Sequence, residues 1–161
     1  MQQPITLDSP APLALGVVPL PAHDVAPVVV RTMLGIVIFP HGAQKAFGWF
    51  GGPGLSGIID YFAQSLNLPL AIALGTVALE LLGPVALVAG FATRAAAAGI
   101  GAIMLGAIAF VHAPHGFFMN WFGVQGGEGY EYHLLVLAMA ASLVITGGGR
   151  WSLDGLLRKA R

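Results

Sequence analysis

The chain has 161 residues, of which 57% are hydrophobic and only 9% are charged, and its mean hydropathy is +0.81. Because soluble domains carry about 25% charged residues, this chain has too few polar side chains to coat a water-soluble globule. Its 7 basic and 7 acidic residues leave no positive excess for binding nucleic acid, and the lack of cysteine excludes disulfides and iron–sulfur ligation. Composition therefore predicts an integral membrane protein whose main partner is the lipid bilayer.

The first 26 residues form a proline-rich segment without lysine or arginine. A signal peptide needs a basic start and an uninterrupted apolar stretch, and Pro19 and Pro21 interrupt the only apolar stretch present. We therefore expect residues 1–26 to be a disordered tail.

Four later stretches are long and apolar enough to form transmembrane helices, which need about 20 mostly apolar residues. They cover approximately residues 28–46, 70–91, 95–112 and 130–146. Small residues in the third stretch recur at small-xxx-small spacing (Ala95/Gly99 and Ala98/Ala102/Gly106), which predicts close helix packing there. The expected fold is all-α, a membrane four-helix bundle built from residues 27–149.

The connections after the first and third stretches are long and aromatic. In the first connection, apolar residues recur at helical spacing and predict a short amphipathic helix at the membrane surface: Leu55, Ile58, Ile59, Phe62 and Leu66. The aromatic residues of the second connection, 113–129, fit an interfacial belt or a lid over a ligand. After the last span, Ser152 is placed to cap a second amphipathic helix within the tail of residues 150–161.

An even number of spans puts both chain ends on one side of the membrane. Most basic residues gather on that side, namely Arg31, Arg94, Arg150, Arg158, Lys159 and Arg161, whereas Lys45 alone lies on the other. By the positive-inside rule, we expect a multi-pass membrane protein with cytoplasmic termini.

The acidic residue Glu80 interrupts the second apolar stretch near its middle. An ionised carboxylate in hydrocarbon is costly unless it is protonated, paired or hydrated, so an intramembrane acid is a candidate functional residue. Arg94 is too far along the helix to pair with it, at about 21 Å. Counting depth from the span ends predicts His41 as the nearest cationic partner, and a structural hydrogen bond is the alternative to a functional role.

Further polar residues lie at the outer ends of the first and fourth stretches. His41, Gln44 and Lys45 share one helical face, while Glu131 and His133 open the fourth span. With Glu80, these six are the predicted ligand-binding residues. Two alternatives need no ligand. Lys45 extends its ammonium group towards the lipid headgroups, and Glu131 complements the dipole of the fourth helix.

Two histidines around the end of the third stretch, His112 and His115, could form a metal site with Glu131 or His133, but their spacing is only a weak signal, and we assign no metal ligand. The sequence also contains no nucleotide-binding loop, zinc-protease motif or nucleophile elbow, so no catalytic residue is predicted.

Several strings in the chain resemble the DoxX family of small membrane proteins, across residues 31–154. They are Arg31 with Gly35, His41-Gly42-x-Gln44-Lys45, Phe47-Gly48-Trp49-Phe50-Gly51-Gly52-Pro53-Gly54, Glu80-x-x-Gly83, Thr93-Arg94, residues 126–131, and Gly149-x-Trp151-Ser152-Leu153-Asp154. The resemblance implies a four-helix membrane fold, a location in the bacterial inner (plasma) membrane and a link to respiratory redox processes. The family takes its name from a small subunit of an archaeal quinol oxidase, which is also described as a thiosulfate:quinone oxidoreductase.

The leading functional hypothesis is therefore an accessory subunit of a quinone-linked redox process. Without a haem, flavin or iron–sulfur signature, the chain would bind quinone non-covalently and depend on a redox partner protein for electron transfer. Two other hypotheses stay open: a permeation or carrier subunit for a small molecule or protons, and a membrane anchor or assembly factor without a ligand. Association with a second copy of the chain also stays open.

Overall fold

The computed structural model describes residues 22–160. These residues form helices and contain no strand, which confirms the all-α prediction. The elements are α1 (Ala22–Phe47), η1 (Trp49–Gly51), α2 (Gly54–Asp60), η2 (Tyr61–Ser65), α3 (Leu70–Ala89), α4 (Thr93–Ala107), η3 (Ile108–His112), η4 (Ala113–His115), α5 (Glu131–Thr146) and α6 (Leu153–Lys159).

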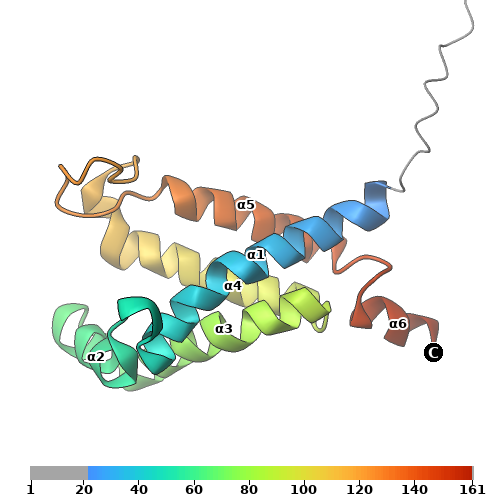
Figure 1. Cartoon of the computed structure of the whole chain (residues 1–161), viewed down its shortest axis with the longest axis horizontal. Helices are drawn as coiled ribbons and strands as arrows, with labels where there is room; N and C mark the ends of the chain where they lie inside the picture. Colours follow the sequence, from blue (N-terminus) through green and yellow to red (C-terminus); the bar gives the residue numbers. More distant parts are fainter. Residues whose placement is uncertain (1–21, 161) are drawn as a thin grey trace, which may run out of the picture.

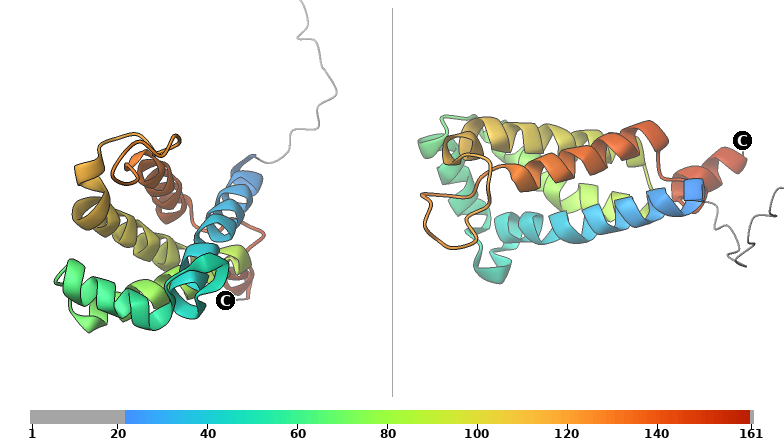
Figure 2. Two further views of the ribbon diagram at one scale, coloured as in Figure 1. Left: turned by 60° about the vertical axis from the view of Figure 1, so that its left-hand side comes forward. Right: turned by 90° about the horizontal axis from the view of Figure 1, so that it is seen from above.

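The four long helices form a bundle in which α1 packs mainly against α3, and α4 against α5 (Figures 1 and 2). The start of α1 and the helix α6 lie at one end of this bundle, which we call the terminus end. The opposite end, which we call the loop end, carries α2 and the long connection between α4 and α5. The two ends of the described chain thus lie at the same end of the bundle, as four spans require.

Three of the four predicted spans are long and apolar enough to cross a membrane, namely 24 residues of α1, the 20 residues of α3, and the 23 residues from α4 through η4. The fourth, α5, is an apolar helix of 16 residues. At 1.5 Å per residue its length is about 24 Å, which is shorter than the roughly 30 Å of a hydrocarbon core. The prediction of an apolar helix is confirmed there, but the helix is short.

The first helix begins earlier than expected. Residues 22–26 are helical, so the prediction of disorder is wrong for them, while residues 1–21 of the predicted tail lie outside the described part of the chain. Asp24 lies in the first turn of α1, where an acidic side chain complements the helix dipole. The proline-rich composition of the segment concealed this start.

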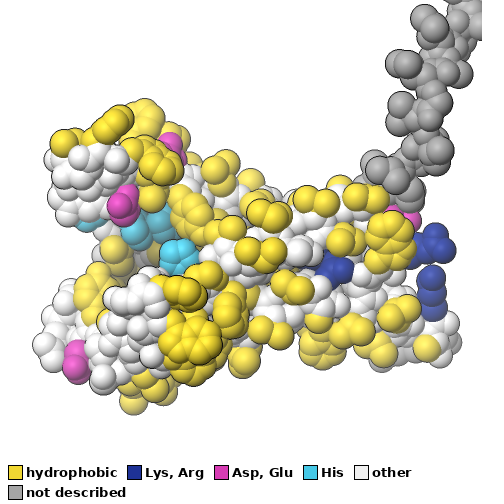
Figure 3. Space-filling view, viewed as in Figure 1, with side chains coloured by type: hydrophobic (Ala, Val, Ile, Leu, Met, Phe, Trp, Pro, Cys, Tyr) yellow, Lys and Arg dark blue, Asp and Glu magenta, His cyan; other side chains and the backbone are white. Residues whose placement is uncertain are grey.

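Hydrophobic side chains are spread along the face of the bundle that Figure 3 shows, and Lys and Arg side chains are few there. Large hydrophobic side chains remain exposed along the outer faces of the long helices, including Ile36 at 56%, Leu82 at 64% and Leu135 at 67%. Water is a poor solvent for such a surface, whereas lipid tails match it. The structure therefore supports the prediction that the bundle is embedded in a bilayer.

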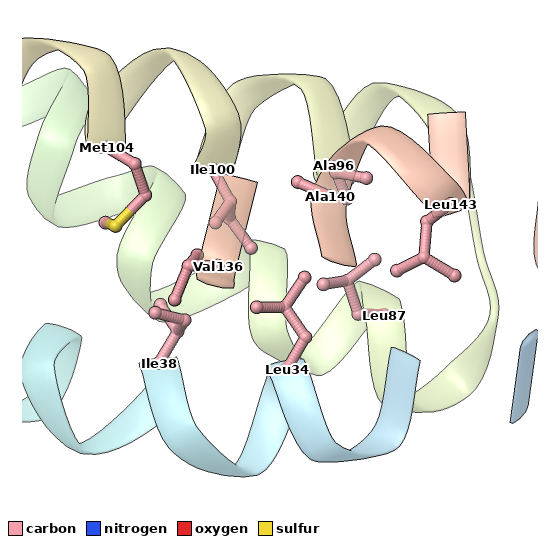
Figure 4. Close-up of a cluster of buried hydrophobic side chains, with 10 residues drawn as sticks. Leu34, Ile38, Leu87, Ala96, Ile100, Met104, Val136, Ala140 and Leu143 are labelled. Atoms are coloured by element: carbon pink, nitrogen blue, oxygen red, sulfur yellow. The ribbon is translucent and has the colours of Figure 1, made fainter. Parts of the chain in front are cut away.

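The core lies between all four long helices (Figure 4) and contains Leu34, Ile38, Leu87, Ala96, Ala97, Ile100, Met104, Val136, Ala140 and Leu143. The closest helix approach is between α1 and α3, where a Cβ at Gly42 would overlap the backbone of Glu80. The small residues Ala95, Ala98 and Ala102, which were predicted to mark a packing face, are exposed instead. The prediction is wrong for these three residues, because α4 turns Ala96, Ala97 and Ile100 towards the core. It holds at Gly99, where a Cβ would meet the side chain of Leu79 of α3 at 2.9 Å.

Arg31 ties three segments together at the terminus end. Its guanidinium is buried and donates hydrogen bonds to the carbonyls of Leu87 (3.0 Å) and Val88, in the last turn of α3, and to that of Trp151 (2.6 Å). The last carbonyls of a helix have no partner within the helix, so a buried cation satisfies them.

Asp154 makes a second tie at this end. Its two carboxylate oxygens accept hydrogen bonds from the backbone N–H groups of Ala92 and Thr93, each at 2.8 Å, where α4 begins. The hydroxyl of Ser152 accepts a hydrogen bond from the N–H of Gly155 at 3.0 Å, which confirms the predicted cap of the last helix. The segment after α5 therefore closes the turn between α3 and α4.

We expect Asp154→Asn to destabilise the protein at neutral pH by about 1 kcal/mol, because the amide is a weaker acceptor for the first turn of α4. Burial raises the pKa of Asp154, but hydrogen bonds from Thr93 and Ala92 and the charge of Arg158 outweigh burial and hold that pKa below its ordinary value of 3.8. The carboxylate therefore contributes its full stabilisation above pH 3.8 and loses it as the pH falls through the lowered folded-state pKa.

Thermal unfolding in detergent at a series of pH values measures this effect. The difference between wild type and Asp154→Asn should shrink as the pH falls below about 4. A difference that is constant or grows with acidity would contradict the role of the carboxylate.

Candidate functional site

Glu80, the acid in the middle of α3, forms an ion pair with Lys45. The Glu80 side chain is 5% exposed and that of Lys45 is 22% exposed. The close contact at Gly42 brings α1 and α3 together one turn before Lys45, so its long side chain reaches the carboxylate. The pair neutralises both charges away from water.

This pairing corrects the sequence-based prediction that His41 is the nearest cationic group to Glu80. His41 is exposed at the surface of α1, and its ring lies 6.3 Å from that of Tyr132 on α5. Depth counting assigned each residue the level of its backbone, whereas the four-carbon side chain of Lys45 extends along the helix.

A cavity of about 460 Å³ adjoins the ion pair, between α3, α4 and the segment from α2 to Leu68. This volume lies within the range typical of small-molecule sites. The walls are mainly apolar, and the lining residues that carry polar side chains are Lys45, Tyr61, Thr76, Glu80 and His112. In Figure 3 the molecule is hollowed at its loop end, with histidine side chains at the edge of the hollow.

Two π-helical turns border this cavity. Tyr61 and Phe62 belong to η2, while Phe110, Val111 and His112 belong to η3. A π turn disturbs the regular helical hydrogen bonding, and such turns occur frequently at functional sites. Both π turns among the described residues face the same space, which marks it as the candidate functional site.

Two histidines meet beside the cavity. The rings of His112 and His133 lie 4.1 Å apart, and His112 lines the cavity, whereas His133 is buried behind it on α5. Nδ1 of His112 lies 2.8 Å from the carbonyl oxygen of Glu128, while Nδ1 of His133 is buried and has no hydrogen-bond partner.

The other predicted ligand-binding residues lie outside the cavity lining. Glu131 accepts a hydrogen bond from the N–H of Met119 at 2.8 Å, and so orders the loop between α4 and α5. The carbonyl of Gln44 accepts one from the N–H of Gly48 at 3.2 Å, where α1 ends. Of the six predicted residues, Lys45 and Glu80 alone line the cavity.

The histidines do not form the metal site considered from the sequence. His115 packs against Gly127 rather than joining His112, and Glu131 is engaged by the loop. Within residues 22–160, no group of three or more metal-binding side chains converges in a suitable arrangement.

Sequence reasoning missed Tyr61 and Thr76 as lining residues, and it assigned His112 only to a weak metal site. Tyr61 lies beside Phe62 in the amphipathic stretch that was predicted after the first span. The helical spacing of apolar residues in that stretch did indicate that one face of it packs against another part of the molecule. The sequence alone, however, did not indicate that this face covers a cavity.

Comparison with known proteins agrees with this architecture. The sequence profile of the DoxX family matches residues 26–113, which is more than half of the chain. The chain belongs to the DoxX family. Every residue that lines the cavity lies within the matched segment of this DoxX protein, whereas Glu131 and His133 lie beyond it.

Over 140 residues, the DoxX chain is 28% identical to the Bacillus subtilis (strain 168) protein named "Putative oxidoreductase CatD". The aligned region covers 87% of this chain and 92% of that relative, so the two are similar over almost their whole lengths. No solved structure gives a significant match.

We expect removal of either member of the ion pair to destabilise this DoxX protein by unequal amounts. Lys45→Met leaves the buried Glu80 carboxylate unpaired and should cost about 3 kcal/mol. Glu80→Gln leaves the more exposed Lys45 free to reach water and should cost about 1.5 kcal/mol. The double variant should recover part of the loss, because it leaves no unpaired charge.

Unfolding of the four proteins in detergent measures these differences. Additive losses in the double variant, or equal losses in both single variants, would contradict a direct and unequally buried pair.

Proposed function

We propose that this DoxX protein is an accessory subunit of a quinone-linked redox process and binds the quinone ring in the cavity beside Lys45 and Glu80. The observation that carries the proposal is the position of this ion pair at the wall of a mainly apolar cavity, within helices that are long enough to span a membrane. A quinone needs an apolar cavity for its ring and chain and a few polar groups for its oxygens.

The polar lining suits both redox forms of a quinone. The Lys45 ammonium can donate a hydrogen bond to a carbonyl oxygen, and the Glu80 carboxylate can accept one from a hydroxyl of the reduced form. Tyr61 and Thr76 add hydroxyl groups to the lining of the same cavity. Ion pairing holds both Lys45 and Glu80 in place before a ligand arrives, which lowers the entropic cost of binding.

Electron transfer requires a partner protein in this proposal. The chain has no cysteine for iron–sulfur ligation and no flavin or haem signature. The relationship to a protein named as an oxidoreductase supports the redox assignment.

The proposed location is the bacterial plasma membrane, with both termini in the cytoplasm. Arg94, Arg158 and Lys159 lie at the terminus end, whereas Lys45 at the loop end is neutralised by Glu80. This distribution of positive charge supports the orientation, since basic residues are retained on the cytoplasmic side. The cavity then belongs to the outer half of the bilayer.

Purification in mild detergent followed by extraction of bound lipid tests the function. We expect wild type to retain quinone in near-stoichiometric amount, and Lys45→Met/Glu80→Gln to lose at least about 90% of it, equivalent to about 1.4 kcal/mol of binding. The double variant removes both polar anchors without changing the net charge.

Lys159→Met is the matched control, because it also removes a lysine but lies on α6 at the terminus end. It should retain quinone like wild type. Wild type without quinone would overturn the proposal. A Glu80-dependent flux of solute or protons in liposomes, in protein that retains no quinone, would favour the carrier hypothesis instead.

A further inference from the structure

The cavity has an open side between α3 and α4. Several of its lining residues are exposed on α3 and on η3, which continues α4, including Ile72 at 49%, Leu79 at 39% and Phe110 at 54%. In a helix that spans a membrane, such a surface faces hydrocarbon rather than water. The cavity is therefore continuous with the lipid phase at this side.

Two glycines form the gap. A Cβ built on Gly75 of α3 or on Gly106 of α4 would meet no atom within 4 Å, although both residues line the cavity. At Gly99, by contrast, a Cβ would meet the side chain of Leu79 at 2.9 Å. The helices are thus in contact beside the ion pair and leave open space towards the loop end.

The cavity has one end with the charged side chains of Lys45 and Glu80, and a long side whose walls are mainly apolar. The lining extends from Gly99 of α4 to His112 at the end of η3, about 20 Å along the helix axis. Leu79 and Gly99 are in contact at the end where Glu80 lies, whereas the wall from Gly75 and Gly106 onward is open and mainly apolar, with Tyr61 and His112 as its polar side chains. A ligand with a polar head and a long apolar chain matches this arrangement better than a compact polar molecule.

We propose that the ligand is a membrane-borne amphiphile with a long hydrocarbon tail, which enters sideways from the bilayer and keeps its tail in the gap between α3 and α4. That the polar head of this ligand is a quinone rests on the function proposed above. That its tail lies in the gap between α3 and α4 rests on the open space at Gly75 and Gly106. Gly106 of α4 thereby acquires a role: it leaves room for a chain instead of packing against another helix.

The test compares three probes on purified protein by native mass spectrometry from detergent micelles. The probes are a quinone with a long isoprenoid tail, the same quinone with a single isoprene unit, and an isoprenoid alcohol that has the long tail but no quinone ring. A Cβ at Gly75 or Gly106 would meet no atom within 4 Å, so we expect Gly75→Leu and Gly106→Leu to fold with the new side chain in the gap.

For both variants we expect occupancy by the long-tailed quinone to fall about tenfold, equivalent to about 1.4 kcal/mol, while occupancy by the short-tailed quinone stays within about twofold of wild type. Ala98→Leu is the matched control, because Ala98 is an exposed small residue of α4 outside the lining. It should bind all probes like wild type.

If both glycine variants bind the long-tailed quinone like wild type, the proposal that the tail lies in the gap is wrong, whereas the proposal that the protein binds quinone stands. Loss of the isoprenoid alcohol in those variants, with no binding of either quinone to wild type, would support the gap and overturn the quinone assignment. Failure of wild type to bind any of the three probes would overturn both.

Discussion

A carboxylate in hydrocarbon has to be neutralised, and Lys45 neutralises Glu80 in this bundle. The pair depends on the close approach of α1 and α3 at Gly42, which leaves no room for a side chain between the two backbones. Since the ion pair lies at the wall of the cavity, the contact that joins these helices also positions the polar groups of the candidate site. The packing of α1 against α3 and the position of the ion pair at the cavity therefore depend on the same contact.

The two ends of the bundle differ in how they are held. At the terminus end, Arg31 and Asp154 connect the segment after α5 to the turn between α3 and α4. Their side chains make hydrogen bonds with backbone groups of these segments. At the loop end, π turns replace regular helix on two sides of the cavity. Tight connections at one end and open space at the other suit a membrane protein that accepts a ligand from the lipid phase.

Most of the fold could be predicted from sequence because apolar stretches of about 20 residues have few alternatives to a membrane helix. Glu80 and Lys45 could also be identified, since charges in such stretches are rare. Their pairing could not, because it depends on the lateral contact of α1 with α3 and on the reach of a lysine side chain. The early start of α1 could not be predicted because the segment before it is rich in proline. The spacing of the small residues in α4 predicted helix packing at Gly106, where the structure has a cavity instead.

The most direct test of the site is photocrosslinking in native membranes with a photoreactive quinone, followed by mass spectrometric mapping of the modified peptides. Our account predicts that the adducts concentrate in residues 68–80 and 99–112, which line the cavity, and that excess unlabelled quinone suppresses them. Adducts confined to α5 or to the loop between α4 and α5, or labelling that excess quinone does not reduce, would contradict it.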